Sequence, residues 1–253
     1  MEIDVITVIL LIFFGFLGAF LNAIVGGGGL ITVPALMFVG LPPASAIATN
    51  KLAATMGNLT STLTFLKAGK VDMKLLGPIV PFVFIFSMLG AWTVHLLDPA
   101  ILKPLVIIML LLVFIYTVIK KDWGQIEKKK ELTWKRKIVF LCSLLAIGFY
   151  DGFFGPGTGS FIIFVFLMMG FDFLQASGNA KLLNFTSNLA ALVMFFILGE
   201  VLFIYGIIMG ISMICGAYVG TKFALKQGTT VVRILFIVTT LILLAKNSYD
   251  YFF

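Results

Sequence analysis

The stretch SGNAKLLNFTSN, residues 177–188, places a lysine among asparagines and serines inside an otherwise apolar run. The stretch ATNKLAATMGN, residues 48–58, does the same in the first half of the chain. Lys51 and Lys181 therefore lie where the surrounding sequence predicts membrane. A lysine at that depth is costly, and it usually faces the interior of a helix bundle and serves a function.

The composition around these stretches is that of a membrane protein. The chain has 253 residues, of which 61% are hydrophobic and 11% charged, and its mean hydropathy is +1.14. A helix crosses the hydrocarbon core with about 20 apolar residues, and backbone groups in lipid must be satisfied within the segment. The strands of a membrane barrel would not be apolar on both faces. The sequence predicts an all-α, polytopic transmembrane bundle with spans at Val5–Ile24, Ala44–Leu66, Leu75–Leu97, Ile101–Ile119, Ile138–Tyr150, Ala176–Leu198, Val201–Val219 and Val231–Ala245, and shorter helices at Leu30–Val39 and Phe161–Met169.

Charge and cysteine content exclude several other classes. The net charge of +7 comes mostly from loops, where it indicates membrane topology rather than nucleic-acid binding. Cys142 and Cys215 form no CxxC pattern, so we expect neither a disulfide nor a metal site, and no cofactor. The first apolar segment has an acidic flank, Glu2 and Asp4, without the basic region of a signal peptide, and we expect it to be retained.

The chain repeats itself after 130 positions. In this register the matching residues include Gly27 and Gly157, Gly29 and Gly159, Lys51 and Lys181, and Asn58 and Asn188. A polar, basic segment, Lys120–Lys137, separates the halves. Internal repeats, each with an interrupted helix at the matching place, are typical of secondary transporters. We therefore predict a first transmembrane repeat at 1–119, a cytoplasmic linker at 120–137 and a second repeat at 138–253.

The positions of the basic loops favour inverted over parallel repeats. Because the linker is strongly basic, we expect it to be cytoplasmic. The other basic loops are 67–74 in the first half and 222–233 in the second, and these are not equivalent positions. Inverted halves bring both loops to the side of the linker, whereas parallel halves leave more basic residues outside. The inverted arrangement requires residues 5–40 to form a re-entrant hairpin with the glycines at its tip.

Each half contains a glycine cluster, GGGG at 26–29 and GPGTGS at 155–160. One interpretation is that small residues let membrane helices pack closely. The other is a broken helix whose exposed N–H groups, together with the positive N-terminus of the next short helix, face the interior. The second interpretation makes anion-binding candidates of the following residues: Gly27, Gly28, Gly29, Gly157, Thr158 and Gly159.

The polar residues around the two lysines share helix faces. Lys51, Thr55, Asn58 and Thr62 lie on one face, and Ser177, Lys181, Asn184 and Asn188 lie on another. A cation with amide and hydroxyl donors predicts a lining for a small oxyanion. The alternative is that the lysines snorkel to the membrane surface. The candidate substrate-binding side chains are Asn50, Lys51, Thr55, Asn58, Asn179, Lys181, Asn184 and Asn188.

Asp151 is the one carboxylate within the apolar stretches, and it lies beside the second glycine cluster. It is a candidate for proton coupling, because intramembrane carboxylates commonly carry protons. It is equally suited to cap the following helix or to pair with a lysine. These three roles remain open at this point.

The motifs GGGGLITVPAL (26–36), ATNKL (48–52), GFYDGFFGPGTGSF (148–161) and NAKLLNFTSN (179–188) resemble the sulfite exporter TauE/SafE family along essentially the whole chain. The resemblance implies a multi-pass permease of a bacterial-type inner membrane that moves sulfite, sulfonates or related organic anions. Its partners would then be a small anionic substrate and the lipid bilayer; the identity of the anion, the direction of transport and a homo-oligomeric state stay open.

Two other functions compete with a transporter. An anion channel shares all of these features and differs in its kinetics. An intramembrane enzyme needs a nucleophile with its base, or a set of metal ligands. One histidine, two scattered cysteines and a lone buried aspartate supply neither. We therefore predict a transporter rather than an enzyme.

Overall fold

The computed structural model describes residues 4–98 and 134–227. The described part is helical, with no strand between residues 4 and 98 or between 134 and 227. Its helices are α1 (Val5–Val25), α2 (Gly29–Phe38), α3 (Pro43–Lys67), α4 (Met73–Leu76), α5 (Val80–His95), α7 (Trp134–Phe153), α8 (Thr158–Met168), α9 (Phe173–Ile197) and α10 (Phe203–Gln227). The predicted spans Ile101–Ile119 and Val231–Ala245 and most of the 120–137 linker lie outside the described residues. The last residues assigned to that linker already belong to α7, which begins at Trp134.

The prediction of an all-α membrane protein is confirmed. Three described helices are long and apolar enough to cross a membrane, namely Val5–Val25, Phe173–Ile197 and Phe203–Lys226. α3 is as long as α9 but less apolar, because it contains more hydroxyl side chains and a second lysine, Lys67. The bundle also contains shorter apolar helices at Gly29–Phe38, Val80–His95 and Thr158–Met168. The chain is a multi-pass membrane protein.

The single span predicted at Leu75–Leu97 is wrong. The structure divides it into α4 and α5, with a turn at residues 77–79 between them. Pro78 and Pro81 both lack the N–H that continues a helical ladder, so two bonds are lost within one turn. Asp72 begins α4 instead, because its side chain accepts a hydrogen bond from the Leu75 N–H at 3.0 Å.

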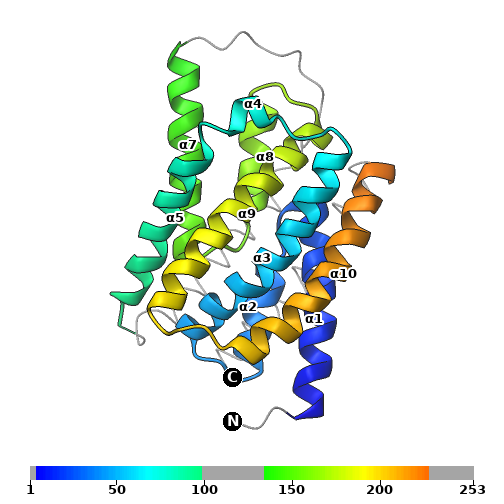
Figure 1. Ribbon diagram of the computed structural model, residues 1–253, viewed down its shortest axis with the longest axis vertical. Helices are drawn as coiled ribbons and strands as arrows, with labels where there is room; N and C mark the ends of the chain where they lie inside the picture. Colours follow the sequence, from blue (N-terminus) through cyan, green and yellow to red (C-terminus); the bar gives the residue numbers. More distant parts are fainter. Residues whose placement is uncertain (1–3, 99–133, 228–253) are drawn as a thin grey trace, which may run out of the picture.

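The helices are arranged around a central crossing of α3 and α9, which pack against each other. α10 packs along α1 and α3, while α5 packs along α7 and α9. In Figure 1, α1, α3 and α10 run upward from their N-terminal ends, and α5, α7 and α9 run downward. α3 and α9 begin 130 positions apart and also end 130 positions apart.

Both glycine clusters interrupt the helices, as the second of the two interpretations predicts. α1 ends at Val25 and is capped by Gly26, which has φ +83°, and α2 begins at Gly29. α7 ends at Phe153, and Gly155 and Gly157 take φ +98° and +83° before α8 begins at Thr158. Side chains are excluded at these positions because L-residues avoid this region of backbone space.

The two breaks also touch each other through bare backbone. A Cβ atom added to Gly26 would lie 2.2 Å from the carbonyl carbon of Gly159, and one added to Gly29 would lie 3.0 Å from the Cα of Pro156. Close packing, the first interpretation, is therefore true as well. The glycines both end the helices and allow the ends to meet at the centre of the protein.

Candidate functional site

Both lysines are fully inside the protein. Lys51 on α3 is 1% exposed and Lys181 on α9 is 0% exposed. Snorkelling to the membrane surface is therefore wrong for both. All eight residues of the two predicted polar faces are buried, which confirms that these faces point inward.

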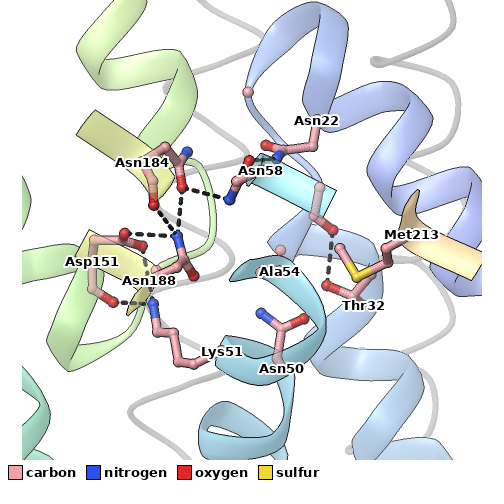
Figure 2. Close-up of a pocket in the computed structure, with 14 residues that line it drawn as sticks. Asn22, Thr32, Asn50, Lys51, Ala54, Asn58, Asp151, Asn184, Asn188 and Met213 are labelled. Carbon is pink, nitrogen blue, oxygen red and sulfur yellow. Dashed lines mark hydrogen bonds and ion pairs between the residues drawn. The ribbon is translucent and has the colours of Figure 1, made fainter. Parts of the chain in front are cut away.

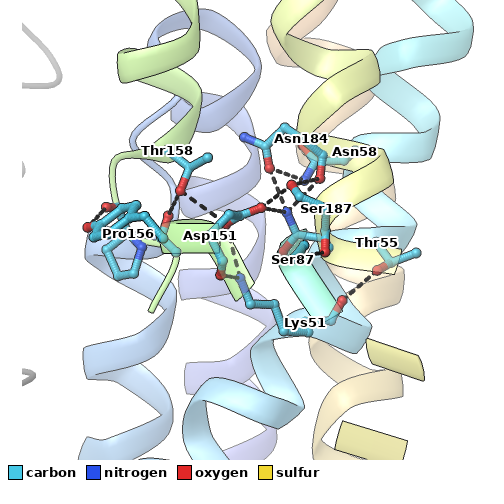
Figure 3. A network of polar contacts seen from close by, with 12 residues as sticks. Lys51, Thr55, Asn58, Ser87, Asp151, Pro156, Thr158, Asn184 and Ser187 are labelled. Atoms are coloured by element: carbon cyan, nitrogen blue, oxygen red, sulfur yellow. Dashed lines mark hydrogen bonds and ion pairs between the residues drawn. The ribbon is translucent and has the colours of Figure 1, made fainter. Parts of the chain in front are cut away.

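Lys51 pairs with Asp151 across the central crossing. Its Nζ lies 3.0 Å from Asp151 Oδ1 and also donates to the backbone carbonyl of Asp151. Thr158 Oγ1 donates to Asp151 Oδ1 at 3.0 Å, and Asn188 Nδ2 donates to Oδ2 at 3.0 Å. Ser187 Oγ donates to Oδ2 as well. Of the three roles left open for Asp151, the structure contains the pairing with a lysine (Figure 3).

Lys181 has no such counter-charge. Its Nζ donates to the backbone carbonyl of Asn22, just before the first glycine break. Within the described residues no carboxylate lies at ion-pair distance from it. Each lysine thus meets a backbone carbonyl beside the break of the opposite half, but only Lys51 also meets an acid.

A chain of amide side chains connects the two breaks. Asn22 Nδ2 donates to Asn58 Oδ1 at 2.8 Å, and Asn58 Nδ2 donates to Asn184 Oδ1 at 3.1 Å. Asn188 Nδ2 donates to the same oxygen of Asn184 at 2.6 Å and reaches Asp151. The four amides therefore run from the residue whose carbonyl holds Lys181 to the carboxylate that holds Lys51.

A small cavity lies along this chain (Figure 2). The space open to the centre of a water molecule is about 20 Å³, which is room for one or two waters. One polar atom in its wall, Asn50 Oδ1, is buried without a hydrogen-bond partner. The lining residues are Asn22, Gly26, Gly28, Gly29, Thr32, Asn50, Lys51, Ala54, Asn58, Asp151, Gly155, Asn184, Asn188 and Met213.

The structure gathers part of the predicted site and leaves part of it aside. The predicted residues that line the cavity are Gly28, Gly29, Asn50, Lys51, Asn58, Asp151, Asn184 and Asn188. Thr55 does not line it, because its hydroxyl donates to the Lys51 carbonyl of its own helix at 2.7 Å. Asn179 lies elsewhere and accepts from the Asp72 N–H at 2.7 Å.

The remaining predicted residues lie around the cavity without lining it. Lys181 reaches the site through Asn22, which does line it. Gly27 and Gly157 belong to the turns of the two breaks, and Gly159 touches Gly26. Thr158 contacts the site by hydrogen bonds to Asp151 Oδ1 and to the carbonyl of Gly155.

Sequence reasoning missed Asn22, Thr32, Gly155, Ser187 and Met213. Asn22 had a signal, since it is a lone amide in an apolar helix shortly before four glycines. Met213 comes from α10, where nothing in the sequence distinguishes it. In the described part of the chain, no three His, Cys, Asp or Glu side chains lie together as metal ligands would.

Comparison with known proteins agrees with a multi-pass membrane protein. The family model of the sulfite exporter TauE/SafE matches residues 11–247. A probable membrane transporter protein of Haemophilus influenzae is 37% identical over 99% of this chain and 98% of its own length. The probable membrane transporter proteins ORF9 of Sinorhizobium sp and YfcA of Escherichia coli are each 34% identical, over 93% and 95% of this chain and 90% and 89% of their own lengths.

No solved structure matches the chain. The relatives are bacterial and are named as transporters rather than enzymes, in agreement with the prediction from the sequence. The family match covers far more than half of the chain, and it covers both buried lysines and both glycine breaks. The chain belongs to the sulfite exporter TauE/SafE family of membrane transporters.

Proposed function

We propose that the protein is a secondary transporter that carries a small anion through the central site between α3, α9 and the two glycine breaks. Sulfite, a sulfonate or a related organic anion is the proposed cargo. The observation that carries the proposal is the contrast between the two buried lysines. Lys51 has a carboxylate at 3.0 Å, whereas within residues 4–98 and 134–227 Lys181 donates to a backbone carbonyl alone.

The charges of the centre leave room for one negative charge. Lys51 and Asp151 neutralise each other, while the ammonium of Lys181 has no opposite charge among the described residues. An unpaired charge at membrane depth is unfavourable: insertion scales put its cost at roughly 2.5–3.5 kcal/mol. A monovalent anion at the centre would supply the missing charge.

The neighbouring groups suit an oxyanion. The asparagine amides provide N–H donors, and the start of α2 at Gly28 and Gly29 brings the positive end of a helix to the cavity wall. Lysine is a strongly hydrated point charge suited to transient holding of an anion. The present cavity holds little more than a water, so the site must open before an anion enters. A site that alternates between closed and open forms fits a transporter better than a continuously open channel.

Asp151 gives a route for proton coupling. As a carboxylate it holds Lys51, and so it competes with an arriving anion for the same ammonium group. Binding a proton to Asp151 would remove this competition and free Lys51 for the substrate. Movement of the anion would thereby be linked to movement of a proton.

Two inverted repeats are part of the proposal. α3 and α9 begin 130 positions apart and end 130 positions apart, and α1 and α7 run in opposite directions. Both observations support inverted repeats. So does a pair of reciprocal contacts: the Leu202 N–H donates to Thr49 Oγ1 at 3.1 Å, as the Asp72 N–H donates to Asn179 Oδ1. Residues 49 and 179, and 72 and 202, are each 130 positions apart.

The basic ends of the helices give the orientation. α3 ends at Lys67, α7 begins with Trp134 followed by Lys135, Arg136 and Lys137, and α10 has Lys226 in its last turn. These three helix ends lie at the upper end of the bundle in Figure 1. Positively charged ends face the cytoplasm. We place this end of the protein on the cytoplasmic side of a bacterial inner membrane.

The test is anion flux in proteoliposomes, with sulfite, methanesulfonate, acetate and phosphate offered separately. We expect saturable uptake of one of these classes that is abolished by Lys181→Met. Lys67→Met, which removes an exposed lysine from the end of α3, should leave uptake unchanged. Wild-type uptake by the Lys181→Met protein would refute the anion site, and flux that never saturates would identify a channel instead.

A further inference from the structure

A second and larger cavity lies at the basic end of the bundle, away from the central site. It occupies about 360 Å³ between the loop that follows α3 and the first turns of α9. Its wall includes Lys70, Asp72, Lys74, Gln175 and Asn179, none of which lines the central cavity. A volume of this size is within the range of small-molecule sites.

The loop is held rigidly against α9. A Cβ atom added to Gly178 would lie 2.3 Å from the backbone carbonyl oxygen of Lys70, so only glycine permits this contact. One residue further along, Asn179 Oδ1 accepts from the Asp72 N–H at 2.7 Å. These two contacts fix the loop on both sides of Val71, and the cavity wall is therefore formed before any ligand arrives.

Asn179 has a donor to spare. Its side chain is 0% exposed, and its Nδ2 is buried without an acceptor. Because the Oδ1 atom is committed to the Asp72 N–H, the amide cannot turn to satisfy the Nδ2 atom. A buried, unsatisfied N–H group in a cavity wall favours a ligand that brings an acceptor oxygen.

The charged groups of the wall favour the same kind of ligand. Neither Lys70 nor Lys74 is in an ion pair within the described residues. The nearby carboxylates are already used as helix caps, since Asp72 Oδ1 accepts from the Leu75 N–H at 3.0 Å and Asp172 Oδ1 accepts from the Gln175 N–H at 2.9 Å. The wall therefore carries two ammonium groups against the one carboxylate of Asp72, a net charge of +1, and one free amide donor.

The equivalent place at the opposite end of the bundle lacks these features. At that end the Thr49 hydroxyl accepts the hydrogen bond from the Leu202 N–H, and a threonine side chain has no amide N–H to offer a ligand. Glu200 stands in the loop instead of a lysine, and it accepts a hydrogen bond from Ser45 at 3.3 Å. Among the residues that the structure describes, this combination of two lysines and a spare amide donor thus occurs at one end of the bundle and not at the equivalent place.

We propose that this cavity binds a small oxyanion, held by Lys70, Lys74 and the free amide N–H of Asn179. The same chemistry belongs to a dissolved sulfate, sulfonate or phosphate and to the phosphate of a lipid headgroup. A dissolved anion bound here would be concentrated at the mouth of the protein. That role rests on the proposed function, whereas the binding itself does not.

The test uses the thiol of Met73→Cys, an exposed position in the cavity wall, in a chain that also carries Cys142→Ala and Cys215→Ala. The rate of labelling by N-ethylmaleimide is measured in phosphatidylcholine nanodiscs, with sodium sulfate or with sodium chloride at equal ionic strength. We expect sulfate to slow labelling severalfold more than chloride does. Equal effects of the two salts would overturn the proposal.

Two double variants separate a site from a general effect of charge. Lys70→Gln with Lys74→Gln removes the two ammonium groups of the wall, while Lys67→Gln with Lys226→Gln removes two charges from the same end outside it. Protection by sulfate should vanish in the first and persist in the second; the same loss in both would refute the site. Asn179→Asp keeps the acceptor for the Asp72 N–H but removes the donor, and it should also abolish protection.

A further labelling experiment, in nanodiscs that contain phosphatidylglycerol, distinguishes a lipid phosphate from a dissolved anion. If phosphatidylglycerol without sulfate slows labelling, and the slowing depends on Lys70 and Lys74, the site stands and its occupant is a lipid phosphate. Labelling requires no transport. If the proposed central site is refuted by normal uptake in Lys181→Met, the labelling result is unaffected. The two proposals can therefore fail independently.

Discussion

Replacing each buried lysine by methionine should have unequal consequences for stability. In Lys51→Met the carboxylate of Asp151 stays buried without its partner, and breaking a buried pair in this way costs about 3–5 kcal/mol. In Lys181→Met no charge is left behind. The carbonyl of Asn22 also keeps its bond from the Gly26 N–H at 2.9 Å.

The magnitude for Lys181→Met follows from two terms of similar size. Removing the charge from membrane depth relieves roughly 2.5–3.5 kcal/mol, and losing a hydrogen bond from a charged donor costs about 1.5–3 kcal/mol. The two nearly cancel. At roughly 2–4 °C per kcal/mol for a chain of this size, the Lys51→Met protein should melt about 10 °C below the Lys181→Met protein.

The assay is thermal unfolding of the purified proteins in one detergent, followed by the loss of the monodisperse peak in size-exclusion chromatography. Lys51→Met combined with Asp151→Asn removes both charges and should regain most of the lost stability. Melting temperatures of the two single variants within about 2 °C of each other would refute the unequal pairing, since that gap corresponds to about 1 kcal/mol or less.

Three further predictions use the same measurement or the flux assay. Gly26→Ala places a Cβ 2.2 Å from backbone of the second break and should prevent a folded yield, whereas Gly69→Ala, with φ +65° and open space around it, should cost only about 1–2 kcal/mol. Thr49→Val leaves the Leu202 N–H without its acceptor and should lower stability by about 1–3 kcal/mol, while Thr62→Val removes a hydroxyl that has no partner and should be neutral or stabilising. Asp151→Asn should retain saturable anion flux but remove its dependence on a proton gradient; unchanged proton dependence would contradict the coupling role.

The sequence predicted the features that depend on local pattern. α3 and α9 begin and end within three residues of the ranges predicted from hydropathy, and both glycine breaks occur where they were expected. The polar faces of Lys51 and Lys181 could be assigned to the interior because a helix repeats every 3.6 residues. By the same geometry Asn179 lies about 200° around α9 from Lys181, so its proximity in sequence does not bring it to the central cavity.

What could not be predicted depends on contacts between distant segments. The pairing of Lys51 with Asp151 joins residues 100 positions apart, and the sequence left it as one of three roles. The different surroundings of two lysines at equivalent positions follow from a single acid in one half, where the other half has Leu21 at the equivalent position and the uncharged Asn22 beside it. The split between α4 and α5 had a local cause, two prolines close together, which a count of apolar residues does not register.

The way α5 and α10 pack has a consequence for synthesis of the chain. α5 packs against α7 and α9, which are synthesised after it. α1 and α3 pack against α10, which is synthesised later still. Neither half can therefore complete its own packing while it is being inserted, and the early helices must stay in the membrane unassembled until translation is nearly finished. Two separately expressed pieces, cut within residues 120–133, should each be degraded when made alone and should accumulate when made together.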